Sequence, residues 1–240
     1  MEVLAELWRR AVVTQPVPGP GTAAVVGGVA LAAILLAWRP VRLLVTVCHE
    51  AGHAVVAVLA GRRLKGIRLH SDTSGLTLSR GRPRGPGMVA ALFAGYPAAA
   101  LVGLGAAWMA GVGHAIGLLW LTVLLLAVML LSLRNLYGAA VVLGLCVVVG
   151  VLSWYATPVV AGWLATGIAW LLLLAAPRPV VELLLRHRPG SDAAQLAALT
   201  HVPRLFWNLL WLVLTAGALV LGAGWLLRLP LWPSAGGPPG

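Results

Sequence analysis

The sequence predicts an all-α polytopic membrane protein with about six or seven transmembrane helices and a small amphipathic β-hairpin after the second span. Of its 240 residues, 60% are hydrophobic and only 10% are charged, a balance too apolar for a soluble globular domain. The apolar residues form continuous runs of about 18–25 residues, the length that a membrane-spanning helix needs. A transmembrane β-barrel would show short alternating segments instead.

Seven apolar runs give the expected order of elements, at 22–38, 41–60, 88–112, 114–133, 136–153, 155–176 and 205–228. They make residues 22–228 a single integral-membrane domain. The short segment 1–21, which ends in a Pro/Gly-rich joint, is expected to be an N-terminal cytoplasmic segment. The apolar run after it is expected to be an uncleaved first span rather than a signal peptide. The Pro/Gly-rich residues 229–240 are expected to form a disordered tail.

Basic residues dominate the charge of the chain, with 17 Lys and Arg against six acids and a net charge of +11. They gather in two polar segments, 61–87 and 177–204. By the positive-inside rule we expect these basic loops on the cytoplasmic side of the cell membrane, against anionic lipids rather than nucleic acid. Arg39 and Arg42 would then fall on the outer side, against the rule.

Residues 64–80 alternate apolar and polar side chains around a turn at 71–75, which predicts an amphipathic β-hairpin. Two interpretations remain open. It is a plain surface hairpin, or its edge pairs with an extended substrate strand. In the second case its apolar side chains would contact the substrate, namely Ile67, Leu69, Leu76 and Leu78.

A metal-binding pattern interrupts the second apolar run. His49 and His53 are four residues apart, so on a helix both imidazoles lie on one face and can bind one Zn²⁺. Glu50, between them, has the chemistry of a general base for a metal-bound water. Ionisable groups are costly in a bilayer, and such a cluster therefore indicates a functional site.

Catalytic zinc sites use three protein ligands, so one more is required. Of the six acids, Glu2 and Glu6 lie in the charged N-terminal segment, Asp72 suits the hairpin turn, and Glu182 suits an ion pair with nearby arginines. Asp192 remains, in a metal-completing segment 189–203. To reach the histidines, residues 191–200 must dip into the bundle as a partly buried helix, which we expect, or the seventh span must begin earlier. The alternative is that Asp192 only caps that helix or favours its dipole.

These motifs resemble the site-2 protease family of intramembrane zinc metallopeptidases, in its compact bacterial branch without a PDZ domain. Besides His49-Glu50-Ala51-Gly52-His53, the likeness includes Gly95-Tyr96-Pro97, Arg134-Asn135-Leu136-Tyr137-Gly138 and Ser191-Asp192-Ala193. It implies zinc ligation by His49, His53 and Asp192, with Glu50 activating the zinc-bound water. Better-studied members have Gly after the Asp and an Asn upstream in the same segment, whereas Ala193 follows Asp192 here.

The resemblance implies a zinc-dependent intramembrane endopeptidase with one Zn²⁺ per chain, which cleaves membrane-embedded or membrane-proximal protein substrates. A zinc protease acting on soluble or peripheral substrates is a variant of this hypothesis. The alternative from another class is a non-catalytic transporter or scaffold with a degenerate or metal-storing site. Asn135 could bond substrate or oxyanion, or else cap a helix or bond a neighbouring one, and His201 could support a ligand. The oligomeric state has no signal in the sequence.

Overall fold

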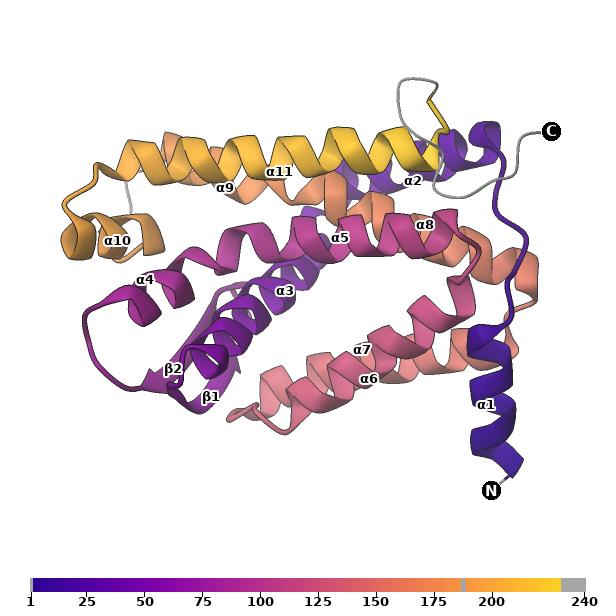
Figure 1. Ribbon diagram of the computed structural model, residues 1–240, viewed down its shortest axis with the longest axis horizontal. Helices are drawn as coiled ribbons and strands as arrows, with labels where there is room; N and C mark the ends of the chain where they lie inside the picture. The colour runs from indigo at the N-terminus through magenta and orange to yellow at the C-terminus, as the bar shows by residue number, and fades with distance from the viewer. Residues whose placement is uncertain (1, 187–188, 230–240) are drawn as a thin grey trace.

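A computed structural model describes residues 2–186 and 189–229, which form a mainly helical bundle with one small hairpin (Figure 1). The predicted tail therefore lies, apart from Leu229, outside the described residues. In chain order the elements are α1 (Glu2–Val12), α2 (Pro20–Leu36), α3 (Trp38–Leu59), β1 (Arg63–Leu69), β2 (Gly75–Arg80), α4 (Pro86–Phe93), α5 (Gly95–Gly111), α6 (Ala115–Leu130), α7 (Leu136–Tyr155), α8 (Pro158–Ala175), α9 (Pro177–Leu185), α10 (Asp192–Thr200) and α11 (Arg204–Leu226).

Among the described residues, four helical segments are long and apolar enough to cross a membrane: α3, α7, the α8–α9 pair and α11. A fifth results if α4 and α5, which meet at 58°, count as one broken span. The apolar helices α2 and α6 are shorter. The chain is thus a multi-pass membrane protein, but the predicted count of six or seven spans is not confirmed.

Helices α2 and α3 run in the same direction beside the α8–α9 pair. The Trp170 indole N–H donates to the Ala23 carbonyl at 2.9 Å near the start of α2, and Arg178 donates to the Ile34 carbonyl at 3.0 Å near its end. Further on, Arg42 of α3 lies 3.5 Å from the Glu182 carboxylate. This path differs from two consecutive spans of opposite direction. It also accounts for Arg42, which lies on a helix and pairs with Glu182 of α9 instead of lying in a loop between spans.

The N-terminal segment and the hairpin lie at opposite ends of α6 (Figure 1). Gln15 accepts a hydrogen bond from the Ile116 N–H, 2.9 Å away at the first turn of α6. Just beyond the other end of that helix, the Ile67 N–H of β1 donates to the Ser132 carbonyl at 2.8 Å. Residues 2–21 and the basic hairpin are therefore separated by the length of α6.

The hairpin forms as predicted. Strands β1 and β2 are antiparallel and pair from Arg63 opposite Arg80 to Leu69 opposite Gly75, with a register shift between Leu64 and Gly66. Its two edges are not equivalent. The outer edge of β1 pairs with the segment between α6 and α7, where Ile67 and Leu133 form a parallel bridge. The apolar side chains of β1 are buried in a cluster with side chains of α3, α6 and α7, whereas those of β2 are exposed. Strand β1 thus anchors the hairpin and leaves β2 at its edge.

Small side chains let the central helices approach closely. Alanines of α5 and α8, including Ala99, Ala107, Ala165 and Ala169, are at most 1% exposed in the main core cluster. Without large side chains, helix backbones pack at short distance, which stabilises helices in a membrane. This packing fixes α5, the helix that lies against the metal-binding face of α3.

Candidate metal centre

Three potential metal ligands meet where α3 faces the start of α10. The Nε2 atoms of His49 and His53 are 2.9 Å apart, and Asp192 Oδ2 lies 3.2 Å from the first and 3.4 Å from the second. In a tetrahedral zinc site with bonds of about 2.0–2.1 Å, ligand atoms are separated by about 3.3 Å. The observed triangle therefore fits a zinc ion, and both the residue types and the spacing suit it.

The three side chains line the floor of a cavity and remain partly accessible, with 20% of His49, 12% of His53 and 16% of Asp192 exposed. The cavity has a volume of about 460 Å³. Its other walls come from α3, the edge strand β2, α4, α5, α9 and α10, and include Leu76, Thr77, Met88, Tyr96, Leu183 and Gln195. The ligand triangle is thus accessible from the cavity.

Asp192 is the first residue of α10, and that short helix is docked rather than loose. Ser191 is its N-cap, with the hydroxyl accepting the Ala194 N–H at 3.3 Å. On the inner face, Ala193 is 1% exposed and Leu196 is fully buried. The cap role is thus filled by Ser191, and Asp192 faces the imidazoles.

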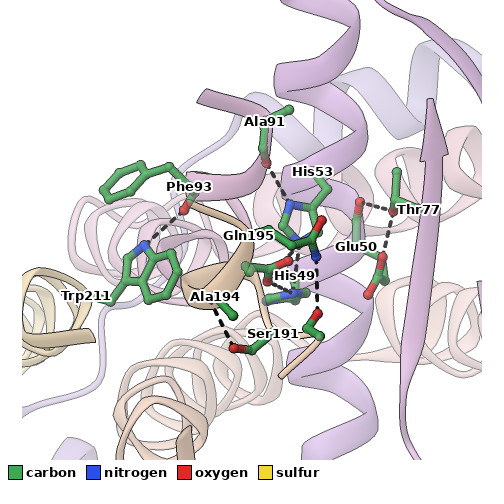
Figure 2. Close-up of polar contacts among 12 residues, drawn as sticks. His49, Glu50, His53, Thr77, Ala91, Phe93, Ser191, Ala194, Gln195 and Trp211 are labelled. Carbon is green, nitrogen blue, oxygen red and sulfur yellow. Dashed lines mark hydrogen bonds and ion pairs between the residues drawn. The ribbon is translucent and has the colours of Figure 1, made fainter. Parts of the chain in front are cut away.

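The orientation of His53 is set by a carbonyl from the end of α4. Its Nδ1 lies 2.7 Å from the Ala91 carbonyl oxygen (Figure 2). A carbonyl can only accept, so Nδ1 carries the proton and Nε2 presents its lone pair to the ligand triangle. Metal-binding histidines are commonly oriented by such a bond. Nothing in the amino-acid pattern points to this partner.

Two glycines let the helices meet beneath the imidazoles. A Cβ at Gly95 would lie 2.5 Å from His53 Nε2 and 2.6 Å from His49 Cε1. A Cβ at Gly52 would lie 2.7 Å from the Ala94 carbonyl oxygen. Gly52 of the HEAGH pattern thus permits close packing of α3 against the junction between α4 and α5.

Glu50 is held by β2. It is only 3% exposed, and the Thr77 hydroxyl donates to its Oε2 at 2.6 Å (Figure 2). A Cβ at Gly75 would lie 2.5 Å from Glu50 Oε1, so the strand passes directly against the carboxylate. Thr77 and Gly75 were missed as site residues, because nothing local in the hairpin sequence connects them to α3.

The four apolar hairpin residues proposed to contact substrate divide between two environments. Ile67 and Leu69 are 1% and 0% exposed, and neither lines the cavity. Leu76 and Leu78 are 45% and 43% exposed, and Leu76 lines the cavity. Asn135 bonds the hairpin itself, accepting the Leu69 N–H at 3.2 Å and donating to the Leu69 carbonyl at 2.6 Å. The structure therefore gives Ile67, Leu69 and Asn135 an anchoring position.

The remaining candidates lie outside the centre. Glu182 forms the expected ion pair with Arg178 at 3.6 Å and also accepts the Trp38 indole N–H at 3.1 Å. Asp72 has its expected turn role, since Ser74 donates to it and lowers its pKa. His201 is the exposed C-cap of α10 and does not line the cavity, so the structure does not place it behind a ligand.

Comparison with known proteins gives one match. The family described as Peptidase M50B-like, a family of site-2 proteases, matches residues 22–222. No curated protein and no solved structure matches the chain significantly. The matched region covers the apolar helices, the hairpin and all three members of the ligand triangle. The chain therefore belongs to the Peptidase M50B-like family of site-2 proteases.

Proposed function

We propose that this protein is a zinc-dependent intramembrane endopeptidase that cleaves membrane-embedded or membrane-proximal protein substrates. One observation carries the proposal: His49, His53 and Asp192 form a triangle of zinc-binding size beside the buried carboxylate of Glu50. The two histidines and Glu50 lie in α3, a helix long and apolar enough to span a membrane. Membership of a metallopeptidase family supports the same reaction. One Zn²⁺ per chain is sufficient for this site.

Each residue of the centre has a distinct task. The two Nε2 atoms and Asp192 Oδ2 would hold the ion, and the bond from His53 Nδ1 to the Ala91 carbonyl keeps that ring turned toward the ligand triangle. When bound, zinc acts as a Lewis acid that polarises the scissile carbonyl and lowers the pKa of water. Glu50 takes a proton from the attacking water and returns it to the leaving amine. Thr77 holds one carboxylate oxygen, leaving Oε1 for this transfer.

The edge of β2 supplies a place for the substrate backbone. A helical substrate hides its carbonyls in hydrogen bonds, so it must unwind before attack. An extended segment can then add as a strand to a free edge, with main-chain hydrogen bonds giving affinity. The cavity is lined by Gly75, Leu76, Thr77 and Ser79 of this strand, next to the ligand triangle. The outer edge of β1 is already paired, which leaves β2 for the substrate.

The basic hairpin end is proposed to face the cytoplasm. Arg62, Arg63 and Lys65 lie on or beside β1, and Arg80, Arg82 and Arg84 lie on or after β2. Such clusters bind anionic lipid headgroups at the cytoplasmic leaflet. In this orientation the N-terminal segment lies on the outer side, since it is at the opposite end of α6.

The test has a metal arm and a catalytic arm. Purified wild-type protein should contain one zinc per chain, and His49→Ala and Asp192→Ala should lose it. Cleavage of a candidate membrane substrate should be abolished in Glu50→Gln, with zinc retained. Full cleavage by Glu50→Gln would refute the mechanism. Stoichiometric zinc without any cleavage would favour the metal-storing alternative, and unchanged zinc in Asp192→Ala would remove that residue as a required ligand.

A further inference from the structure

Trp211 of α11 connects a distant helix to the metal centre. The side chain is fully buried and reaches the junction between α4 and α5, where its indole N–H donates to the Phe93 carbonyl at 3.0 Å (Figure 2). Its ring also stacks on Tyr96, the second residue of α5, with centroids 4.4 Å apart and an interplanar angle of 29°. Trp211 thus contacts both sides of the junction.

The junction is a break that leaves a carbonyl in need of a donor. In a continuous helix the Phe93 carbonyl would accept the N–H of the residue four positions later. That residue is Pro97, which has no N–H, and α4 and α5 meet at 58°. A buried carbonyl without a partner is destabilising, so the bent form needs a donor from elsewhere. The indole of Trp211 supplies it.

The break matters because the two imidazoles contact opposite sides of it, His53 the α4 side and His49 the α5 side. On the α4 side, the Ala91 carbonyl accepts from His53 Nδ1 at 2.7 Å. On the α5 side, Tyr96 packs edge-on against His49, with centroids 4.8 Å apart. A change in the angle between α4 and α5 would therefore displace the partner of one histidine relative to the partner of the other.

The third ligand is linked to the same side chain. Trp211 belongs to a buried cluster that includes Leu92 of α4 together with Ala193 and Leu196 of α10. These two residues form the inner face of the helix that begins at Asp192. The side chain of Trp211 thus belongs to the packing around the partners of both histidines and around the helix of Asp192.

We propose that Trp211 is a positioning residue for the metal centre. Its indole N–H fixes the bend between α4 and α5, and the bend sets the orientation of His53 and His49. The inference rests on the proposed zinc site and adds a residue that the family motif does not contain. It is specific to the N–H group, because a phenyl ring would keep the stacking on Tyr96 but not the bond to Phe93.

Trp207, one turn earlier in α11, provides a matched control. Its ring lies 6.0 Å from Phe93, centroid to centroid, and its buried indole nitrogen has no hydrogen-bond partner within the described part of the chain. Trp207→Phe and Trp211→Phe therefore remove the same atoms from the same helix. Only the second removes a hydrogen bond.

The experiment measures zinc affinity by chelator competition on full-length, detergent-solubilised protein, and thermal stability with and without zinc. Trp211→Phe should bind zinc about 10–100-fold more weakly, the usual effect of losing a group that orients metal ligands. Trp207→Phe should bind zinc like the wild type. A Trp211→Phe protein that is less stable without zinc but has unchanged zinc affinity would overturn the proposal, since Trp211 would then be purely structural.

A second variant leaves Trp211 in place. Pro97→Ala restores a backbone N–H that can bond the Phe93 carbonyl inside a straighter helix, and zinc affinity should fall again. Unchanged affinity in Pro97→Ala would overturn the proposal even if Trp211→Phe fails to fold. Wild-type protein without zinc would overturn the metal site itself, whereas zinc-loaded wild type with unaffected variants would overturn only the role of Trp211.

Discussion

The two halves of the ligand triangle are built in different ways. His49 and His53 come from one long helix, and their spacing of four residues alone places them on one face. Asp192 comes from a nine-residue helix, and only the packing of that helix brings its carboxylate to 3.2 Å from His49. The first half is local and the second is tertiary. Substitutions near the two histidines and substitutions around α10 should therefore change zinc binding and stability in different ways.

The largest loss of zinc binding is expected from a substitution that adds atoms next to the two histidines, the local half of the site. In Gly95→Ala the added methyl group would lie 2.5 Å from His53 Nε2 and 2.6 Å from His49 Cε1, so both imidazoles must move. We expect loss of stoichiometric zinc and of proteolysis, measured by metal analysis and substrate cleavage. Gly105→Ala in the same helix is the control, because nothing lies within 4 Å of its added methyl. Wild-type zinc content in Gly95→Ala would show that the local half tolerates displacement.

The position of Asp192, the tertiary half of the site, should depend on the buried side chains that dock α10. Leu196→Ala removes a fully buried side chain from the inner face of α10, and a cavity of this kind costs about 2–5 kcal/mol. We expect a lower melting temperature and weaker zinc binding that excess zinc restores, since metal and docking are linked. Ala198→Ser, at an exposed position of α10, is the control. If Leu196→Ala lowers stability but leaves zinc affinity intact, Asp192 does not depend on this docking.

The same division explains what could be predicted from the sequence. The hairpin and the HEAGH pair follow from short-range periodicity, and the structure contains both. Asp192 was found because acids are so scarce, and not from any pattern. The direction of α2 was missed, because two apolar runs look alike whether the chain reverses or continues. The partners of Glu50 and His53, namely Thr77 and the Ala91 carbonyl, were missed because they exist only after helices and hairpin pack.

Thr77→Val tests whether Glu50, the proposed general base, depends on a tertiary contact. The three proposed zinc ligands are left unchanged. The change keeps the shape of the side chain but removes the hydroxyl that donates to Glu50 at 2.6 Å. A hydrogen bond to a charged group contributes about 1.5–3 kcal/mol, which corresponds to a loss of roughly 10–100-fold in kcat. Zinc content should not change, because Thr77 touches no ligand. A loss of zinc together with activity would instead place Thr77 in support of the metal.

The smallest effect concerns the ion pair between α3, the helix that carries the two histidines, and α9. Arg42 and Glu182 are 3.5 Å apart, with 30% and 28% of their side chains exposed. Partly exposed pairs contribute little, so a double-mutant cycle with Arg42→Gln and Glu182→Gln should give a coupling energy of about 1 kcal/mol or less in unfolding. Zinc affinity should hardly change in any of the three variants, because α10 is docked by its apolar face. A drop in zinc affinity comparable to that of Leu196→Ala would mean that charge, rather than apolar packing, sets the distance between α3 and α10.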